Sequence, residues 1–198
     1  AAARNADVAI VFAYRWASEG MDLPDMSLPH HQDDIIAAVA KANPHTIVVL
    51  ETGNPVTMPW VAAPAAIMEA WFSGSDGADA VANILFGSVN PSGKLPNTFP
   101  LSEADLPHPT ITKPPKTSQG FDGAATPEQW AKGLPPFDVT YDEGAMVGYK
   151  WYEAKHKPVL FPFGFGLSYT TYAYSGLKVT SGDTVQASFT IANTGVRS

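Results

Sequence analysis

The residues best suited to chemistry gather in one loop near the start of the chain. Glu19, Asp22 and Asp25 follow the run Asp7–Ala13, whose short, β-branched and mostly apolar pattern predicts a strand buried on both faces. In an open α/β sheet, ligands bind where the carboxyl ends of the strands meet. We therefore expect the carboxyl group of Glu19, which can donate or accept a proton, to meet a ligand there. The competing interpretation is a solvated acidic turn.

The elements around this loop alternate as they do in α/β proteins. The predicted elements are a helix over Gln32–Ala42, a buried strand over Thr46–Leu50, a third strand over Ala65–Trp71, and a helix over Ala78–Phe86 that ends at Gly87. This order predicts a largely parallel sheet sandwiched by helices. We expect the loops after the strands to share one rim with Glu19, among them residues 51–54 and 72–77.

The second half of the chain is less regular. Leu106–Pro136 is rich in proline, glycine and threonine, which predicts a functional loop or lid, with Phe121 and Trp130 as candidate anchors. After it come three kinds of segment. They are a strand-like alternation over Met146–Tyr152, a packed glycine-rich and aromatic connector over Phe161–Thr170, and two strands over Tyr172–Thr180 and Thr184–Asn193. Two strands cannot bury a core alone, so we expect this chain to be a fragment of a longer protein.

Composition limits the function. The 198 residues are 45% hydrophobic and only 16% charged, with a net charge of −7, which argues against nucleic acid and anionic membranes as partners and suits a neutral ligand. The chain has no cysteine, and no apolar run is long enough to span a bilayer. Its five histidines are scattered or adjacent, so we expect no metal site and no cofactor.

Three other side chains have two interpretations each. Trp60 and Trp71 could stack on the face of a sugar, but aromatic residues near strand ends are more often part of the core. Lys94 follows Ser92 and Gly93 in a tight turn, which favours a structural role.

The order of short motifs resembles one known family. The Glu19 loop reads Ser-Glu-Gly-x-Asp and is followed by Leu-Pro. Further motifs in the same order are Asn43-Pro44, Thr57–Trp60, Ala70–Phe72, Leu85–Gly87, Asn90–Pro96, Thr98–Pro100, Val147–Tyr152 and Phe161–Thr170. Together they cover nearly the whole chain. This series resembles glycoside hydrolase family 3, the β-glucosidase and β-xylosidase family.

The resemblance assigns roles to particular residues. It implies that Glu19 is the general acid/base of a retaining hydrolysis, while the nucleophilic aspartate lies in an amino-terminal barrel outside this chain. Asp22 matches an aspartate of the family pattern, but Leu23 stands where a basic residue is common, so the counter-charge of that basic residue is missing from the loop. Asp22, Trp71 and Phe72 are the candidate substrate-binding residues.

The resemblance also implies a domain division. We expect an α/β sandwich domain over residues 1–105 whose start is truncated, a long loop and connector over 106–170, and the first strands of a fibronectin type III-like domain over 171–198. The expected partners are the barrel segment and a β-glucoside or oligosaccharide, with a homodimer left open. A periplasmic or secreted location is favoured, with the signal region outside these residues.

The function implied is that of an exo-acting β-glucosidase that releases terminal β-D-glucose. A β-xylosidase or exo-β-glucanase of the same family remains the alternative within this class. A non-catalytic sugar-binding or structural α/β module remains the alternative outside it.

Overall fold

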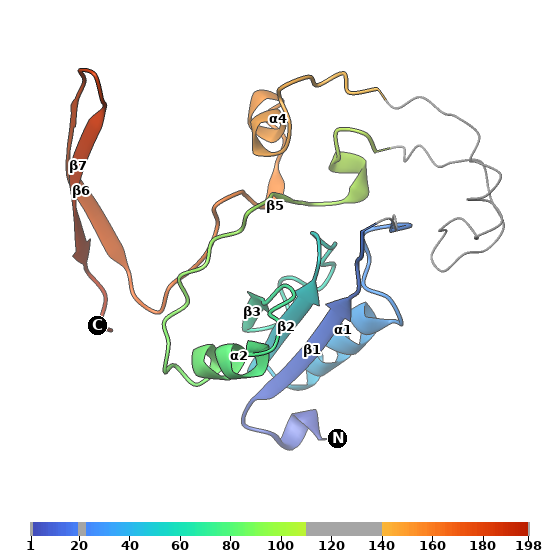
Figure 1. The fold of residues 1–198 in the computed structure, drawn as a ribbon. Coiled ribbons are helices and arrows are strands. Elements are labelled where there is room, and N and C mark those ends of the chain that lie inside the picture. Colours follow the sequence, from blue (N-terminus) through green and yellow to red (C-terminus); the bar gives the residue numbers. More distant parts are fainter. Residues whose placement is uncertain (1, 20–22, 110–139, 198) are drawn as a thin grey trace.

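The computed structural model describes residues 2–19, 23–109 and 140–197 (Figure 1). In chain order the elements are η1 (Ala3–Asn5), β1 (Ala9–Arg15), α1 (Gln32–Ala42), β2 (Thr46–Thr52), β3 (Ala66–Glu69), α2 (Gly77–Leu85), β4 (Phe99–Pro100), η2 (Glu103–Asp105), α4 (Tyr149–Ala154), β5 (Val159–Phe161), β6 (Tyr172–Thr180) and β7 (Gln186–Asn193). Most of the segment predicted as a lid, with Phe121 and Trp130, lies outside the described residues.

A parallel sheet of three strands in the order β1-β2-β3 forms the centre of the fold. The register aligns Ala13 with Leu50 and Arg15 with Thr52, while Leu50 also aligns with Glu69. The carboxyl ends of the three strands therefore lie at one edge of the sheet, as predicted. The loops that follow them form one rim.

The two long helices lie on opposite sides of this sheet (Figure 1). Helix α1 has the predicted bounds, and it carries acidic residues in its first turn and Lys41 in its last, which favours its dipole. The side chain of Gln32, at the start of α1, accepts the Tyr14 N–H (2.8 Å) and donates to the Tyr14 carbonyl (2.9 Å), so it pairs with backbone of β1. Helix α2 begins one residue earlier than predicted, and the chain leaves it at Gly87, where φ is +76°.

The core lies between α1 and the sheet. Its buried members are Ala13, Leu28, Ile36, Val48, Leu50, Val56, Met58, Trp60 and Phe99. Trp60 is only 4% exposed, and its Nε1 donates to Oδ1 of Asp33 at 2.6 Å. Trp60 is therefore a core residue, which was the favoured interpretation.

The prediction that the first strand is buried on both faces is wrong. Ala9 and Ala13 point into the core, but Ile10, Phe12 and Tyr14 on the other face are 43%, 57% and 52% exposed. Among the described elements, α1 packs on one face of β1, whereas the other long helix, α2, makes no comparable contact with this strand. An apolar run alone does not reveal how many faces of a strand are covered.

A short antiparallel pair, β4 with β5, connects the parallel sheet to the rest of the chain. Beside it the predicted connector packs against the Lys94 turn. The Leu95 N–H donates to the Phe165 carbonyl and the Gly164 N–H to the Leu95 carbonyl, each at 2.8 Å, and Nζ of Lys94 donates to the Gly166 carbonyl. Lys94 thus has the structural role expected of it.

The prediction of a strand over Met146–Tyr152 is wrong, because α4 occupies Tyr149–Ala154. Tyr149 stacks on Phe163 with ring centroids 4.7 Å apart, and Tyr152, three positions later, is buried. That spacing belongs to a helix, and the alternating pattern was too short to distinguish the two periods. Gly148, with φ of +56°, makes the turn into the helix.

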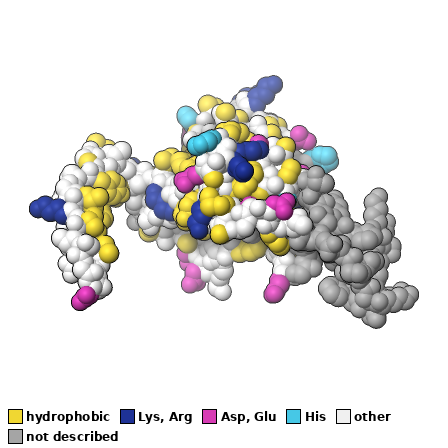
Figure 2. Space-filling model, turned by 90° about the horizontal axis from the view of Figure 1, so that it is seen from above, with side chains coloured by type: hydrophobic (Ala, Val, Ile, Leu, Met, Phe, Trp, Pro, Cys, Tyr) yellow, Lys and Arg dark blue, Asp and Glu magenta, His cyan; other side chains and the backbone are white. Residues whose placement is uncertain are grey.

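The last two strands form an antiparallel hairpin, β6 with β7, close to the predicted ranges. It stands apart from the parallel sheet (Figure 1), and hydrophobic side chains gather along it (Figure 2). All of its strand residues are exposed, including Tyr174, Leu177 and Phe189. The expectation that further strands pair with this hairpin stays a prediction.

Candidate functional site

The loop that follows β1 carries Glu19 and returns to the core at Leu28; we call residues 16–28 the Glu19 loop. Glu19 is exposed at the carboxyl end of β1, on the rim predicted for it. Its neighbours Gly20 and Asp22 lie outside the described residues, so the roles expected of Asp22 stay predictions.

The returning arm of this loop is fastened to the body of the protein at Met26. The Met26 N–H donates to Oε1 of Glu103 at 2.6 Å, and the Met26 carbonyl accepts the Thr57 N–H at 2.8 Å. Leu28, two residues later, is buried in the core. These contacts come from three separate parts of the sequence, so the fold as a whole sets the position of this arm.

An aromatic groove of about 280 Å³ lies on the same rim. It is lined by Tyr14, Trp16, Glu51, Trp71, Phe72, Ser73 and Gly74. These residues come from the ends of the three parallel strands and the segments that follow them. Glu19 is not among the lining residues, although Trp16 at the start of its loop is. Aromatic side chains with one carboxylate suit a polar ligand with apolar faces, such as a sugar.

The two predicted binding aromatics differ in what they offer. Phe72 is 55% exposed and presents its ring to the groove. Trp71 is half-buried, with its ring packed toward Phe99 at a centroid distance of 6.1 Å. Trp71 also has φ of +53°, a strained value for a residue with a side chain. Phe72 is thus the better placed of the two to contact a ligand.

A largely buried carboxyl group that no sequence pattern indicates, that of Glu69, lies beneath the rim. Oε1 of Glu69 accepts the Trp71 N–H at 3.0 Å, and Oε2 lies 3.3 Å from Oγ1 of Thr52. Burial raises the pKa of Glu69 to about 7, against the opposing effect of these hydrogen bonds. Oγ1 of Thr52 also donates to the Asn54 carbonyl at 2.9 Å, so a protonated Glu69 can donate to Thr52 in turn. Glu69 therefore braces the backbone that carries Trp71.

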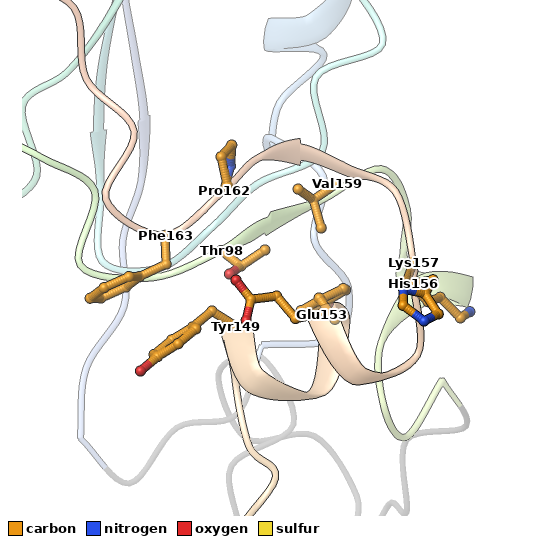
Figure 3. A pocket seen from close by; sticks show the side chains of 9 residues that line it. Thr98, Tyr149, Glu153, His156, Lys157, Val159, Pro162 and Phe163 are labelled. Atoms are coloured by element: carbon orange, nitrogen blue, oxygen red, sulfur yellow. The ribbon is translucent and has the colours of Figure 1, made fainter.

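A second hollow, of about 520 Å³, lies between α4 and β5. Figure 3 shows Glu153 pointing toward Thr98 there, beside the stacked rings of Tyr149 and Phe163. None of the predicted site residues lines it. Within the described ranges, no cluster of three histidine, aspartate or glutamate side chains is arranged to hold a metal ion.

Comparison with known proteins identifies the family of this chain. Residues 1–169 match the model of the glycosyl hydrolase family 3 C-terminal domain. The chain belongs to this family. This match confirms the resemblance seen in the motifs. It also confirms the predicted α/β fold with added antiparallel strands.

The family 3 relatives include named β-glucosidases. The chain is 40% identical over 175 residues to a β-glucosidase of Rhizobium radiobacter, covering 87% of this chain and 19% of that protein. It is 41% identical over 204 residues to β-glucosidase B of Emericella nidulans, covering 98% of this chain and 23% of the relative. The chain therefore spans about a fifth of the length of these curated relatives.

Solved family 3 structures have the same fold. The chain matches DesR, a β-glucosidase from Streptomyces venezuelae in complex with D-glucose, with a TM-score of 0.77 and 40% identity over 98% of this chain and 23% of that one. It matches β-glucosidase 3B from Thermotoga neapolitana in complex with glucose with a TM-score of 0.79 and 33% identity over 98% and 26%.

The sequence patterns do not indicate Glu69, because it sits in a strand whose run of apolar residues suggests only core. Glu51 lies on the rim as expected, although at the end of β2 and not in the loop after it. The alternation of sides along each strand was the available signal, since it places Tyr14 beside Glu51 in the register.

Proposed function

We propose that this chain supplies the general acid/base, Glu19, of an exo-acting retaining β-glucosidase. The main support is positional. Glu19 is exposed on the rim formed by the parallel strands, on the loop whose first residue lines the aromatic groove. Relatives that are named β-glucosidases, two of them solved with glucose, support the choice of substrate.

The reaction needs a second carboxyl group about 5 to 5.5 Å from the first in a retaining enzyme. In the proposed arrangement that nucleophile is the aspartate of an amino-terminal barrel, which docks over the rim. Glu19 protonates the departing glycosidic oxygen in the first step and takes a proton from water in the second. Phe72, with Trp71 behind it, offers an apolar wall to the sugar or to the leaving group.

The dependence of rate on the leaving group tests this role. In the complete enzyme, Glu19→Ala should greatly reduce kcat/KM for cellobiose and alkyl glucosides and reduce it much less for activated aryl glucosides, because a good leaving group departs without a proton in the first step. Glu51→Ala removes another carboxylate from this rim, Asp22→Ala removes one that is close to Glu19 in the sequence, and both serve as controls. An equal loss with every leaving group for Glu19→Ala would reject the assignment.

The alternatives differ in measurable ways. A β-xylosidase or exo-β-glucanase would show higher kcat/KM on aryl xylosides or longer glucans than on aryl glucosides. A non-catalytic module would bind sugar without turnover in a particle that lacks the barrel, which the mass of the purified particle reveals. A homodimer would show in the same mass measurement.

We also propose a periplasmic or secreted location, since oligosaccharides are too polar to cross a bilayer unaided. In the described part of the chain, no helix combines the length and apolar character that crossing a membrane requires. Cell fractionation with an activity assay tests the location.

A further inference from the structure

An ion pair closes the base of the Glu19 loop. Arg15 is the last residue of β1, and its Nη1 lies 2.9 Å from Oδ1 of Asp25, ten positions later on the returning arm. Arg15 is only 5% exposed, whereas the side chain of Asp25 is 44% exposed. The pair therefore joins the two arms of the loop at the level of the sheet, with Glu19 beyond it.

Asp25 is held in place independently of Arg15. The same Oδ1 accepts the Ser27 N–H at 2.9 Å and the Ser27 hydroxyl at 2.8 Å. Burial acts to raise the pKa of Asp25, but the hydrogen bonds from Ser27 and the Arg15 cation outweigh it, so the pKa is lowered. Since Met26 is also fastened to Glu103 and Thr57, the returning arm is a fixed support.

Arg15 is fixed from the other side by the sheet. It aligns with Thr52 in the register of β1 with β2, and Nε of Arg15 has no hydrogen-bond partner among the described residues. Asp25 is thus the carboxylate that holds this buried cation in the described part of the protein. A buried cation with one anionic partner tolerates little displacement of that partner.

We propose that the Arg15–Asp25 pair is a positioning device that sets where Glu19 stands relative to the bond being cleaved. This inference rests on the proposed function of Glu19. Arg15 and Asp25 are positioning residues, because they act through the loop and do not touch the substrate. An error of about 1 Å in the position of a reacting group can cost about 100-fold in rate. The first chemical step should therefore slow only for substrates whose leaving group needs the proton of Glu19.

The test compares two substrates in the complete enzyme. In Arg15→Met and Asp25→Asn, kcat/KM, which reports the first chemical step, should fall by about 100-fold for an alkyl β-glucoside and change little for dinitrophenyl β-glucoside. Arg15→Lys keeps the charge but not the planar geometry, so its kcat/KM for the alkyl glucoside should lie between the values of these variants and that of the unaltered enzyme. The double variant should lose no more kcat/KM for the alkyl glucoside than either single variant, because both changes break the same interaction.

A matched control separates positioning from stability. Nζ of Lys157 lies 3.6 Å from Oδ1 of Asp105, in an ion pair outside the Glu19 loop. Lys157→Met should therefore change kcat/KM by the same factor for both substrates. Melting temperatures are measured for every variant. If Arg15→Met fails to fold, the nearly isosteric Asp25→Asn decides the question.

The outcomes distinguish this inference from the function on which it rests. The pair is structural only, and the inference is wrong, if Arg15→Met and Asp25→Asn lower kcat/KM for both substrates in equal proportion while Glu19→Ala keeps its leaving-group dependence. If Glu19→Ala itself shows no leaving-group dependence, the proposed function fails and the inference with it.

Discussion

Ala17, in the Glu19 loop, lies directly against Gly53, in the loop after β2. A Cβ atom placed on Gly53 would stand 2.8 Å from Cβ of Ala17 and 3.0 Å from Cε2 of Phe72. Real Cβ atoms essentially never come as close as 2.8 Å to another heavy atom, and a contact of 3.0 Å is unusually tight. The absence of a side chain at Gly53 therefore lets the Glu19 loop and the aromatic groove approach each other.

Gly53→Ala should push these two segments apart. We expect overpacking to cost about 1–3 kcal/mol of folding free energy and to reduce turnover of substrates that need the acid. Chemical denaturation and kcat for an alkyl glucoside measure the two effects. Gly182→Ala is the control, since nothing lies within 4 Å of the added Cβ. An unchanged kcat in Gly53→Ala would mean that this contact does not determine the position of the Glu19 loop relative to the groove.

Glu69 should make stability depend on pH. Burial raises its pKa in the folded state to about 7 from the ordinary 4.5, so the folded protein binds the proton more tightly than the unfolded chain. Stability should therefore fall as the pH rises from about 4.5 to 7, by about 3 kcal/mol in total. Glu69→Gln, neutral at every pH, should lack this decline and be the more stable protein at neutral pH. Denaturant unfolding across this range measures the effect, and identical pH profiles for both proteins would contradict it.

Phe72 should contribute to binding more than to folding. Because its ring is 55% exposed, Phe72→Ala should leave the melting temperature nearly unchanged and raise KM by up to about tenfold. Phe86→Ala removes an even more exposed ring, 83% exposed, that does not line the groove. Equal KM values for the two variants would show that the groove does not bind substrate.

The local parts of the fold could be predicted from the sequence. The bounds of α1 follow from acidic residues in its first turn and the Asn43-Pro44 stop, and the parallel order follows from the alternation of elements. The exposed face of β1 could not be predicted, because it depends on which elements pack there. The helix at Tyr149–Ala154 was missed because its packing depends on Phe163, which lies beyond the helix.

In the candidate site, too, local features could be predicted from the sequence and contacts between distant residues could not. The position of Glu19 after a strand could be predicted, but its supports could not. The Met26 bond to Glu103 joins residues 77 positions apart, and no local pattern predicts such a contact. Glu69 looks like part of an apolar strand until its partner Thr52 is known.

The β6–β7 hairpin should gain partners in the complete enzyme. A two-stranded hairpin with exposed apolar side chains is at best marginally stable in water, so we expect additional strands to cover it. Truncation before Tyr172 should lower the melting temperature of the complete enzyme while kcat of the folded fraction stays close to that of the intact protein. An unchanged melting temperature would argue against this role.

The product formed by Glu19→Ala in the presence of azide tests the central claim most directly. Without the general base, a small anion can attack the glycosyl-enzyme intermediate in place of activated water. The account predicts that azide restores part of the rate on an activated aryl glucoside and yields β-glucosyl azide, identified by NMR, whereas Glu51→Ala yields only glucose. If Glu19→Ala gives no rate recovery and no glucosyl azide, the general acid/base lies elsewhere.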